Sequence, residues 1–277
     1  MIVVDRLSFG YKKGKLLFDN LNLHLTAGHI YGLLGRNGVG KSSLLRNIAG
    51  LLYPNSGSIR VSGFNPRERK PAFLQQIYFI PEEIYLPSET ILKYLAVYSP
   101  FYPQFDEAQF RYYLTELDVP FDNRIPDLSF GQRKKVQISF ALACNTDVLI
   151  MDEPTNGLDI PSKRQFRKLL ASALREDQLI LISTHQVRDL DNLIDSVIVL
   201  ESSEILLHQP LHRVSEQLRF ATLSQAEDDQ RVLYAEPSLQ GYTVVMENSE
   251  QRESKVDLER LFNAAMENPN RIRQLFN

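Results

Sequence analysis

A glycine-rich loop at residues 35–42 constrains the fold of this chain more than any other feature. The loop reads GRNGVGKS and satisfies the pattern G-x-x-x-x-G-K-[ST]. It follows an apolar run at residues 30–34 and precedes a segment whose apolar residues recur at helical spacing. A strand, such a loop and a helix in this order form a phosphate-binding site, because the glycines let successive backbone N–H groups point at phosphate oxygens. The loop therefore predicts an α/β protein that binds a phosphorylated ligand.

Further short apolar runs extend this prediction to the whole chain. They lie at residues 77–80, 148–151, 179–182 and 197–200. Runs that are apolar throughout are typical of strands buried on both faces of a mostly parallel sheet. Helical spacing between them is clear at Phe166, Leu169, Leu170 and Ala173, and approximate at Val187, Leu190 and Ile194. We therefore expect a mostly parallel sheet flanked by helices.

Three regions depart from this alternation. Short alternating runs at residues 2–9, 21–26 and 58–62 predict a small antiparallel β-subdomain. Residues 84–127 show helical patterns without a convincing strand, so we expect a helical insertion, with a helical subdomain over about residues 84–145. The composition shifts beyond residue 212, which divides the chain into a main domain (1–212) and a short α+β C-terminal extension (213–277). That extension includes a polar segment at residues 224–230, a predicted strand at 242–246 and a final helix carrying Leu258, Leu261, Phe262 and Ala265.

Composition excludes several classes of protein. The 31 basic and 34 acidic side chains give a net charge of −3, whereas a non-specific nucleic-acid binder carries a basic excess, so we expect no nucleic-acid partner. The single cysteine, Cys144, excludes an intrachain disulfide and a cysteine-based zinc cluster. No apolar run approaches the roughly 20 residues that span a bilayer. We therefore expect a cytoplasmic chain that reaches a membrane only through a partner.

Polar side chains on and after predicted strands supply the chemistry of the phosphate site. Lys41 brings a positive charge and the Ser42 hydroxyl is a ligand for Mg²⁺. The apolar run at residues 148–151 ends in Asp152 and Glu153. Asp152 is placed to enter the coordination shell of the metal, and Glu153 to orient or deprotonate an attacking water.

A third motif, LSFGQ at residues 128–132, precedes a helical segment. Here the chain resembles the ATP-binding-cassette (ABC) ATPases, whose signature reads LSGGQ, over residues 1–212. Ser129 is a good N-cap, so this helix would direct free N–H groups and its dipole at an anion. The resemblance implies that this anion is the γ-phosphate of an ATP held by a second subunit. It thus implies a head-to-tail dimer, homo- or heteromeric, with two sandwiched ATP molecules.

The resemblance also assigns roles residue by residue. It implies catalysis by Glu153, with His185 as the switch histidine. It implies magnesium binding by Ser42, Glu82 and Asp152. It implies nucleotide binding by Tyr11, which would stack on adenine, and by Gly35, Asn37, Gly38, Gly40, Lys41, Ser42, Ser43, Ser129, Gly131, Gln132 and Asp159.

Two positions depart from the family pattern. Phe130 replaces the first glycine of the signature, so its side chain must point away from the phosphate, leaving Ser129 and Gly131 to make the contact. Glu82 occupies the position of the usual magnesium-contacting glutamine. A carboxylate still offers an oxygen to Mg²⁺, but it adds a third acid beside Asp152 and Glu153.

The function implied is ATP hydrolysis coupled to transport. It would drive conformational change in a separate transmembrane permease, which the chain meets at the inner face of the cell membrane. The arrangement resembles export-type (ABC-2-like) ATPases. The alternative is a soluble ABC ATPase that acts on nucleic acid or ribosomes; a P-loop kinase or GTPase would leave the signature without a role.

Residues 84–130 hold 11 of the 27 Phe and Tyr residues, which form the core of the insertion or a groove for a partner helix. The final helix docks either on the chain itself or on another subunit.

Overall fold

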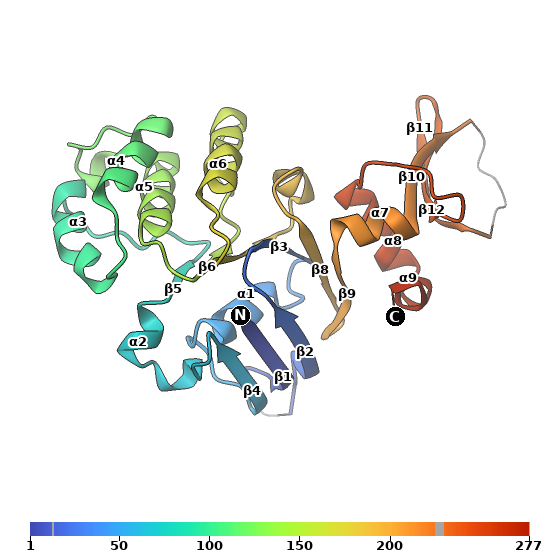
Figure 1. The fold of residues 1–277 in the computed structure, drawn as a ribbon, viewed down its shortest axis with the longest axis horizontal. Coiled ribbons are helices and arrows are strands. Elements are labelled where there is room, and N and C mark those ends of the chain that lie inside the picture. Colours follow the sequence, from blue (N-terminus) through green and yellow to red (C-terminus); the bar gives the residue numbers. More distant parts are fainter. Residues whose placement is uncertain (13, 225–229, 277) are drawn as a thin grey trace.

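The computed structural model describes residues 1–12, 14–224 and 230–276. Its centre is a six-stranded sheet in the order β5-β6-β7-β3-β8-β9 (Figure 1). The strands are β3 (His29–Leu34), β5 (Ile77–Ile80), β6 (Val148–Asp152), β7 (Leu179–Thr184), β8 (Ser196–Glu201) and β9 (Glu204–Pro210). Five of them pair in parallel, and β9 adds an antiparallel edge to β8. The predicted mostly parallel α/β sheet is confirmed, although the sequence analysis did not identify β9.

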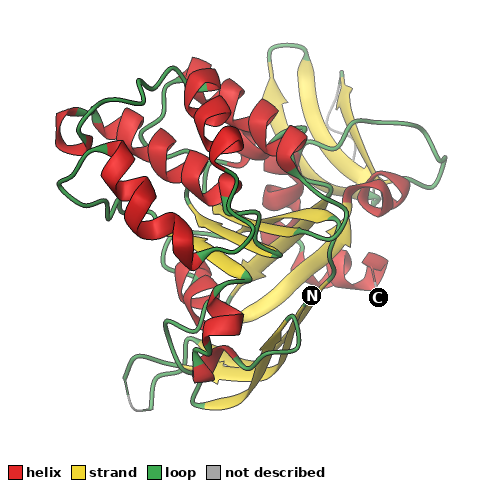
Figure 2. Cartoon of the chain, turned by 60° about the vertical axis from the view of Figure 1, so that its left-hand side comes forward, coloured by secondary structure: helices red, strands yellow, loops and turns green. Residues whose placement is uncertain are grey.

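The parallel strands are largely apolar because both faces of the sheet are covered, as Figure 2 shows. Leu149 and Met151 of β6 lie in one hydrophobic cluster with residues of α5 (Phe130–Ala143) and α6 (Ile160–Ala173). Val148 and Ile150 point the opposite way and lie in a second cluster with residues of α1 (Lys41–Ile48). One strand thus contributes to two cores, which requires an uninterrupted apolar run.

The predicted antiparallel subdomain is also confirmed. It is a three-stranded sheet in the order β2-β1-β4, formed by β1 (Ile2–Phe9), β2 (Phe18–Leu25) and β4 (Ser56–Val61). Residues of β2 alternate between buried and exposed over much of its length, because one face packs on the core and the other meets solvent. Helix α1 contacts both β4 and β6, so it lies between the two sheets.

The helical insertion follows β5. It contains α3 (Ile91–Tyr98), η2 (Ser99–Phe101), α4 (Glu107–Glu116), η3 (Ile125–Asp127) and the start of α5. Asp106 caps α4 by accepting a hydrogen bond from the backbone N–H of Gln109. A short helix, α2 (Pro71–Leu74), and the turn η1 (Pro66–Glu68) precede β5.

Aromatic residues of the insertion divide into two groups. Phe140 is 1% exposed and forms the centre of the first group. Its ring lies 4.8 to 6.2 Å, between centroids, from the rings of Tyr78, Tyr94, Tyr102, Phe105 and Phe110. The second group is exposed and comprises Tyr85, Tyr98, Phe101, Tyr112 and Phe130. The insertion therefore buries part of its aromatic surface and presents the rest.

One helical prediction is wrong. The apolar spacing at Val187, Leu190 and Ile194 predicted a helix, but the structure has only the 3₁₀ turn η4 (Val187–Leu190). Asp191 is extended and Asn192 has a φ of 59°, so the backbone leaves helical geometry before Ile194. The three apolar side chains still pack inward from this turn and its continuation.

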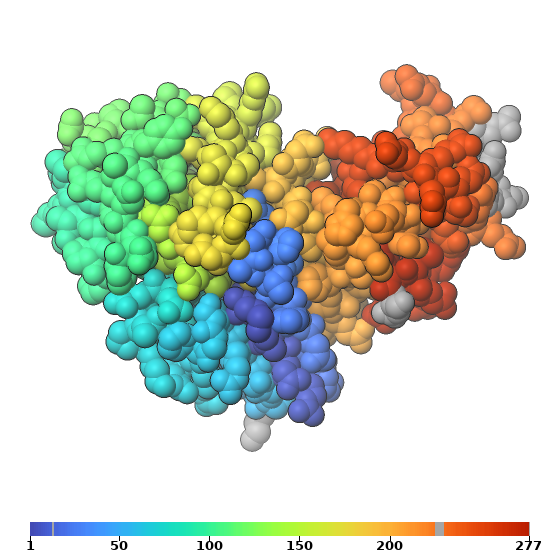
Figure 3. All heavy atoms as spheres, viewed as in Figure 1, coloured from blue at the N-terminus to red at the C-terminus, as the bar shows by residue number. Residues whose placement is uncertain are grey.

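The C-terminal extension is more elaborate than predicted. It contains α7 (Leu211–Gln217), β10 (Leu218–Leu223), β11 (Val232–Ser238), β12 (Gly241–Glu247), α8 (Leu258–Glu267) and α9 (Pro269–Phe276). The predicted strand and final helix correspond to β12 and α8; α7, β10, β11 and α9 were missed. Of the predicted polar segment at residues 224–230, residues 225–229 lie outside the described residues. Figure 3 shows the extension and the helical insertion at opposite ends of the molecule.

Helix α8 docks on the chain itself. Leu258 and Leu261 are buried in the same hydrophobic cluster as Leu190 of η4 and Val199 of β8. The apolar face of this helix is thus covered within one molecule. Among the described residues, no helix combines the length and the apolar composition needed to cross a membrane.

Candidate nucleotide-binding site

The phosphate loop connects β3 to α1 as the sequence predicts. Gly38 and Gly40 have φ values of 81° and 112°, which favour glycine. A Cβ atom on Gly40 would also lie 2.8 Å from the ring of Phe18, so this position is closed to any side chain. The loop therefore curls tightly at the N-terminus of α1, where backbone N–H groups and the helix dipole favour an anion.

Lys41 is buried at the start of α1. Its Nζ donates hydrogen bonds to the carbonyl oxygens of Gly35 (2.8 Å) and Arg36 (3.3 Å). Burial lowers the pKa of Lys41, and the carboxylates of Glu153 and Asp152 oppose that shift. The ammonium group thus lies across the loop that the sequence predicts to hold phosphate.

Asp152 ends β6 beside the phosphate loop. Its Oδ1 accepts hydrogen bonds from the hydroxyls of Ser42 (3.0 Å) and Ser183 (2.6 Å). Its Oδ2 is buried and has no hydrogen-bond partner within the described ranges. A buried carboxylate oxygen without a partner is costly, and a cation beside Ser42 and Asp152 would satisfy it. The donor set of these two residues therefore fits Mg²⁺.

Glu153 contacts the predicted switch histidine. The Oε1 atom of Glu153 lies 2.9 Å from Nδ1 of His185 and 4.0 Å from Nζ of Lys41. Its Oε2 is buried and, in the described part of the chain, accepts no hydrogen bond. Glu153 has a φ of 48°, a left-handed backbone conformation that is uncommon for a non-glycine residue. The turn after β6 thus directs this carboxylate toward β7, whose last residue precedes His185.

The signature segment begins α5 at the surface. The Ser129 hydroxyl accepts from the N–H of Gln132, and the Gln132 side chain accepts from the N–H of Ser129, so the two residues form a capping box. Both Ser129 and Phe130 are exposed. No hydrogen bond or ion pair joins Ser129, Gly131 or Gln132 to the phosphate loop in the residues that the structure describes. This helix start is therefore accessible to a second molecule.

Phe130 packs on the loop that follows Glu153. A Cβ atom on Gly157 would lie 2.4 Å from the Phe130 ring, so the ring rests directly on the Gly157 backbone. Gly157 has a φ of 79°. The side chain that interrupts the signature is thus held against a neighbouring glycine of the same chain.

The remaining predicted residues surround this centre. Tyr11 is 64% exposed, and its hydroxyl lies 2.9 Å from Oγ of the buried Ser43. The Asp159 side chain caps α6 by accepting a hydrogen bond from the N–H of Ser162. Hydrogen bonds from Ser162 lower the pKa of Asp159. Glu82 lies beyond the end of β5, where its Oε1 accepts from Nδ2 of Asn156 (2.9 Å).

A cavity of about 570 Å³ adjoins the phosphate loop. Its lining comes from three segments: Gly35, Arg36 and Asn37 of the loop, residues 184–189 after β7, and Glu259, Phe262 and Asn263 of α8. Arg188 and Glu259 form an ion pair across it at 2.8 Å. Sequence reasoning did not place the extension beside the nucleotide residues, because no motif marks a contact between segments 71 residues apart.

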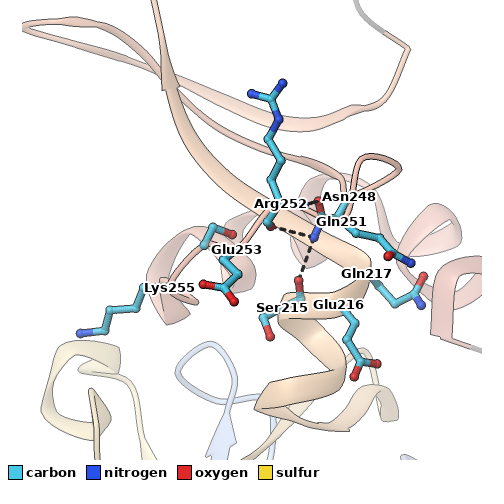
Figure 4. Close-up of a pocket in the computed structure, with 9 residues that line it drawn as sticks. Ser215, Glu216, Gln217, Asn248, Gln251, Arg252, Glu253 and Lys255 are labelled. Atoms are coloured by element: carbon cyan, nitrogen blue, oxygen red, sulfur yellow. Dashed lines mark hydrogen bonds between the residues drawn. The ribbon is translucent and has the colours of Figure 1, made fainter.

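A second cavity, of about 880 Å³, lies within the extension (Figure 4). It is lined by residues 215–217, Asn248 and residues 251–255. The Asn248 side chain donates to the carbonyl oxygens of Ser215 and Arg252 and accepts from the N–H of Arg252. Asn248 therefore holds the loop against α7, and none of the predicted nucleotide residues lines this cavity.

Comparison with known proteins decides the family. The family model described as ABC transporter matches residues 18–156, half of the chain. The chain belongs to the ABC transporter family of ATPases. The ABC transporter ATP-binding protein NatA of Bacillus subtilis is 32% identical over 214 residues, covering 74% of this chain and 86% of NatA. The chain is accordingly an ATP-binding, ATP-hydrolysing protein, and the predicted α/β fold of ABC type is confirmed.

Other relatives of this ABC ATPase carry names of both transport directions. The Nod factor export ATP-binding protein I of Burkholderia lata is 29% identical over 208 residues, covering 73% of this chain and 68% of that protein. The phosphonates import ATP-binding protein PhnC of Wolinella succinogenes is 29% identical over 225 residues, covering 74% and 82%. The solved structure of cbiO1 from Clostridium perfringens, part of the ABC transporter complex cbiONQ, superposes with a TM-score of 0.65 at 27% identity, covering 77% of this chain and 89% of cbiO1.

Proposed function

We propose that this ABC ATPase drives a membrane transporter by binding two ATP molecules between two cassettes arranged head to tail. One observation carries the proposal. Lys41, Asp152, Glu153 and His185 converge beside the phosphate loop, whereas the Ser129-capped start of α5 is exposed and, within the described ranges, forms no hydrogen bond or ion pair with them. Each chain thus presents two half-sites that a second cassette completes.

The two half-sites are complementary in charge. The phosphate loop would hold the triphosphate through its N–H groups and Lys41, whose Nζ would exchange the carbonyls of Gly35 and Arg36 for phosphate oxygens. The γ-phosphate would then face the second cassette, where Ser129, Gly131 and the N-terminal dipole of α5 stabilise negative charge. Tyr11 would stack on adenine and Asp159 would contact the opposite cassette.

Hydrolysis is assigned to Glu153 and His185. Bound Mg²⁺ supplies charge neutralisation of the phosphates, and Ser42, Asp152 and Glu82 are the residues proposed to hold it. Among the described residues the buried Oε2 of Glu153 has no hydrogen-bond partner, so this oxygen would be the one to orient a water and take its proton. His185 fixes the carboxylate through Oε1.

An apolar groove offers a place for the separate transmembrane permease. A cavity of about 620 Å³ lies between Leu51, the α2 region, the β5 residue Phe79 and the exposed Tyr98 and Phe101. We assign it to an apolar helical segment of the permease, because the chain's ABC relatives are transporter ATPases and no described helix spans a membrane. The chain would then lie at the cytoplasmic face of the membrane through this partner.

Export is the proposed direction. Support comes from the sequence resemblance to export-type cassettes, above all the Phe130-containing signature. We also propose that residues 1–212 form the ATP-binding domain and residues 213–277 an accessory unit. The extension reaches the nucleotide site through the Arg188–Glu259 ion pair.

Mixing two inactive variants tests the shared site. Glu153→Gln disables the phosphate-loop half of a site, and Ser129→Arg disables the signature half. Their heterodimer retains one intact site, so an equimolar mixture should recover about a quarter of wild-type turnover, because half of the dimers are mixed and each has one of two sites. A mixture of Glu153→Gln with Lys41→Ala is the matched control, since both changes affect the same half and no intact site can form.

Sedimentation provides a second measurement. Glu153→Gln with ATP should sediment as a dimer, and adding Ser129→Arg to the same chain should restore the monomer. Monomeric ATP-bound Glu153→Gln, together with absence of recovery on mixing, would contradict the shared site.

Co-purification tests the partner. From detergent-extracted membranes of the source cells, the wild type should recover a membrane protein, and Phe101→Glu should lose it while still binding ATP. Tyr112→Glu is the control, because Tyr112 is an exposed aromatic residue of α4 outside the groove. Recovery of RNA or DNA without a membrane protein would favour the alternative of a soluble ABC ATPase.

A further inference from the structure

Glu82 lies where three segments meet. Its backbone carbonyl accepts a hydrogen bond from Nζ of Lys134 (2.8 Å), a residue of α5 whose exposed fraction is 0%. Its side-chain Oε1 accepts from Nδ2 of Asn156 (2.9 Å), in the loop after Glu153. The segment after β5 is thus tied both to the signature helix and to the loop that carries the catalytic carboxylate.

Asn156 continues the connection on its other side. Its Oδ1 accepts a hydrogen bond from Nε2 of Gln186 (3.2 Å), the residue that follows His185. Its backbone N–H donates to the carbonyl oxygen of Glu153 (3.2 Å). One amide residue therefore holds the Glu153 turn, the segment after the switch histidine and Glu82 in a single arrangement.

Gln186 is itself anchored from two directions. Its backbone N–H donates to Oγ1 of Thr184 (2.9 Å), and its Oε1 accepts from Nζ of Lys163 (2.7 Å). Lys163 also pairs with the buried Asp189 at 2.8 Å. Gln186 is exposed, but these two bonds tie it to the end of β7 and to α6, so the Asn156 contact connects the Glu153 turn to both elements.

We infer that Asn156 is a positioning residue for ATP hydrolysis, which keeps Glu153 and His185 in contact by bonding to Glu82 on one side and Gln186 on the other. An amide is required because the site needs a donor toward the Glu82 carboxylate and an acceptor for Gln186 at once. An aspartate would keep the acceptor but place a second carboxylate against Glu82. The inference rests on the proposed catalytic roles of Glu153 and His185.

A double-mutant cycle between positions 82 and 156 tests this coupling. Asn156→Asp should lower kcat about tenfold, the equivalent of one charge-assisted hydrogen bond lost in the transition state, with KM for ATP unchanged. In a Glu82→Gln background the amide at position 82 can donate to Asp at 156, which also still accepts from Gln186. In that background the same Asn156→Asp change should lower kcat less than twofold, because the hydrogen bond between positions 82 and 156 is restored with donor and acceptor exchanged.

Two further readouts separate positioning from loss of folded protein or of metal. The stoichiometry of ATP bound per chain should be unchanged in every variant, so a lower kcat reports slower chemistry and not fewer active molecules. The Mg²⁺ concentration for half-maximal turnover should be the same in Asn156→Asp as in the wild type. Gln165→Glu is the matched control, because Gln165 of α6 also donates to a carboxylate, that of Asp118 (2.8 Å) just after α4. This variant should leave kcat unchanged.

The inference would be overturned if Asn156→Asp lowered kcat by the same factor in both backgrounds, or if Asn156→Asp alone had the kcat of the wild type. Failure of the proposed catalytic roles is detected separately, by wild-type turnover of Glu153→Gln. The two failures are thus distinguishable.

Discussion

The Nδ1 atom of His185 lies 2.9 Å from Oε1 of Glu153, so the imidazole and the carboxylate act as one unit. The two residues follow adjacent parallel strands, β7 and β6, whose C-terminal ends meet at the phosphate loop. Ligand sites in such sheets lie at this edge. The remaining Glu153 oxygen, Oε2, has no hydrogen-bond partner in the described residues and is the atom that we propose orients the attacking water.

Removal of the histidine should uncouple this pair. We expect His185→Ala to lower kcat about 100-fold, within the usual range for loss of a positioned proton-transfer group, while the Kd for ATP stays within a factor of two. Steady-state hydrolysis and ATP titration measure the two quantities. His212→Ala is the control, because His212 is an exposed histidine of α7, and it should behave as wild type. Undiminished turnover of His185→Ala would show that Glu153 needs no such partner.

Loss of the buried lysine should affect binding instead. Lys41→Ala removes the ammonium group that spans the phosphate loop, and we expect ATP affinity to fall by about 10- to 100-fold, as for loss of one hydrogen bond to a charged group. Isothermal titration measures the change. Lys163→Ala serves as a comparison, because Lys163 pairs with Asp189 outside the loop. An unchanged Kd for Lys41→Ala would exclude the loop as the phosphate site.

Phe140 should dominate the stability of the helical insertion. Its ring is buried among five others, so Phe140→Ala should cost about 3–5 kcal/mol of unfolding free energy through the cavity it leaves. Tyr112→Ala, at a 53% exposed position, should change stability by less than about 0.5 kcal/mol. Denaturant unfolding monitored by circular dichroism compares them. Similar losses for the two variants would contradict the assignment of this core.

Stability should fall on mild acidification because of His208. Burial, with His24 nearby, lowers the pKa of His208 below its usual 6.5. As pH falls through 6.5 the unfolded chain binds a proton at this position that the folded chain does not, so the free energy of unfolding decreases with decreasing pH. Thermal unfolding between pH 7.5 and 5.5 should show a smaller decrease in Tm for His208→Gln than for the wild type. An equal decrease would show that His208 does not contribute.

Most of the local chemistry was readable from the sequence. The phosphate loop, the acids after β6 and the Ser129 cap depend on neighbouring residues, since glycine conformation, strand ends and helix capping are local properties. The five parallel strands were equally clear, because a strand buried on both faces must be apolar at every position. One exception was the segment at residues 187–194, where apolar spacing persists although the backbone turns at Asn192. Strand β9 and four elements of the extension were also not predicted.

Long-range partners were decided only by the tertiary structure. Asn156 and Glu82 are 74 positions apart, and Arg188 and Glu259 are 71 apart. Glu82 was singled out by its place in the family pattern, but no motif marks Asn156, Arg188 or Glu259, and no pattern indicates either pairing. The sequence by itself determined which groups can grip a phosphate, because that ability lies in contiguous residues. Which groups hold the catalytic pair in place was decided by how strands and loops pack, since hydrogen bonds between distant segments form only when the whole chain brings them within about 3 Å.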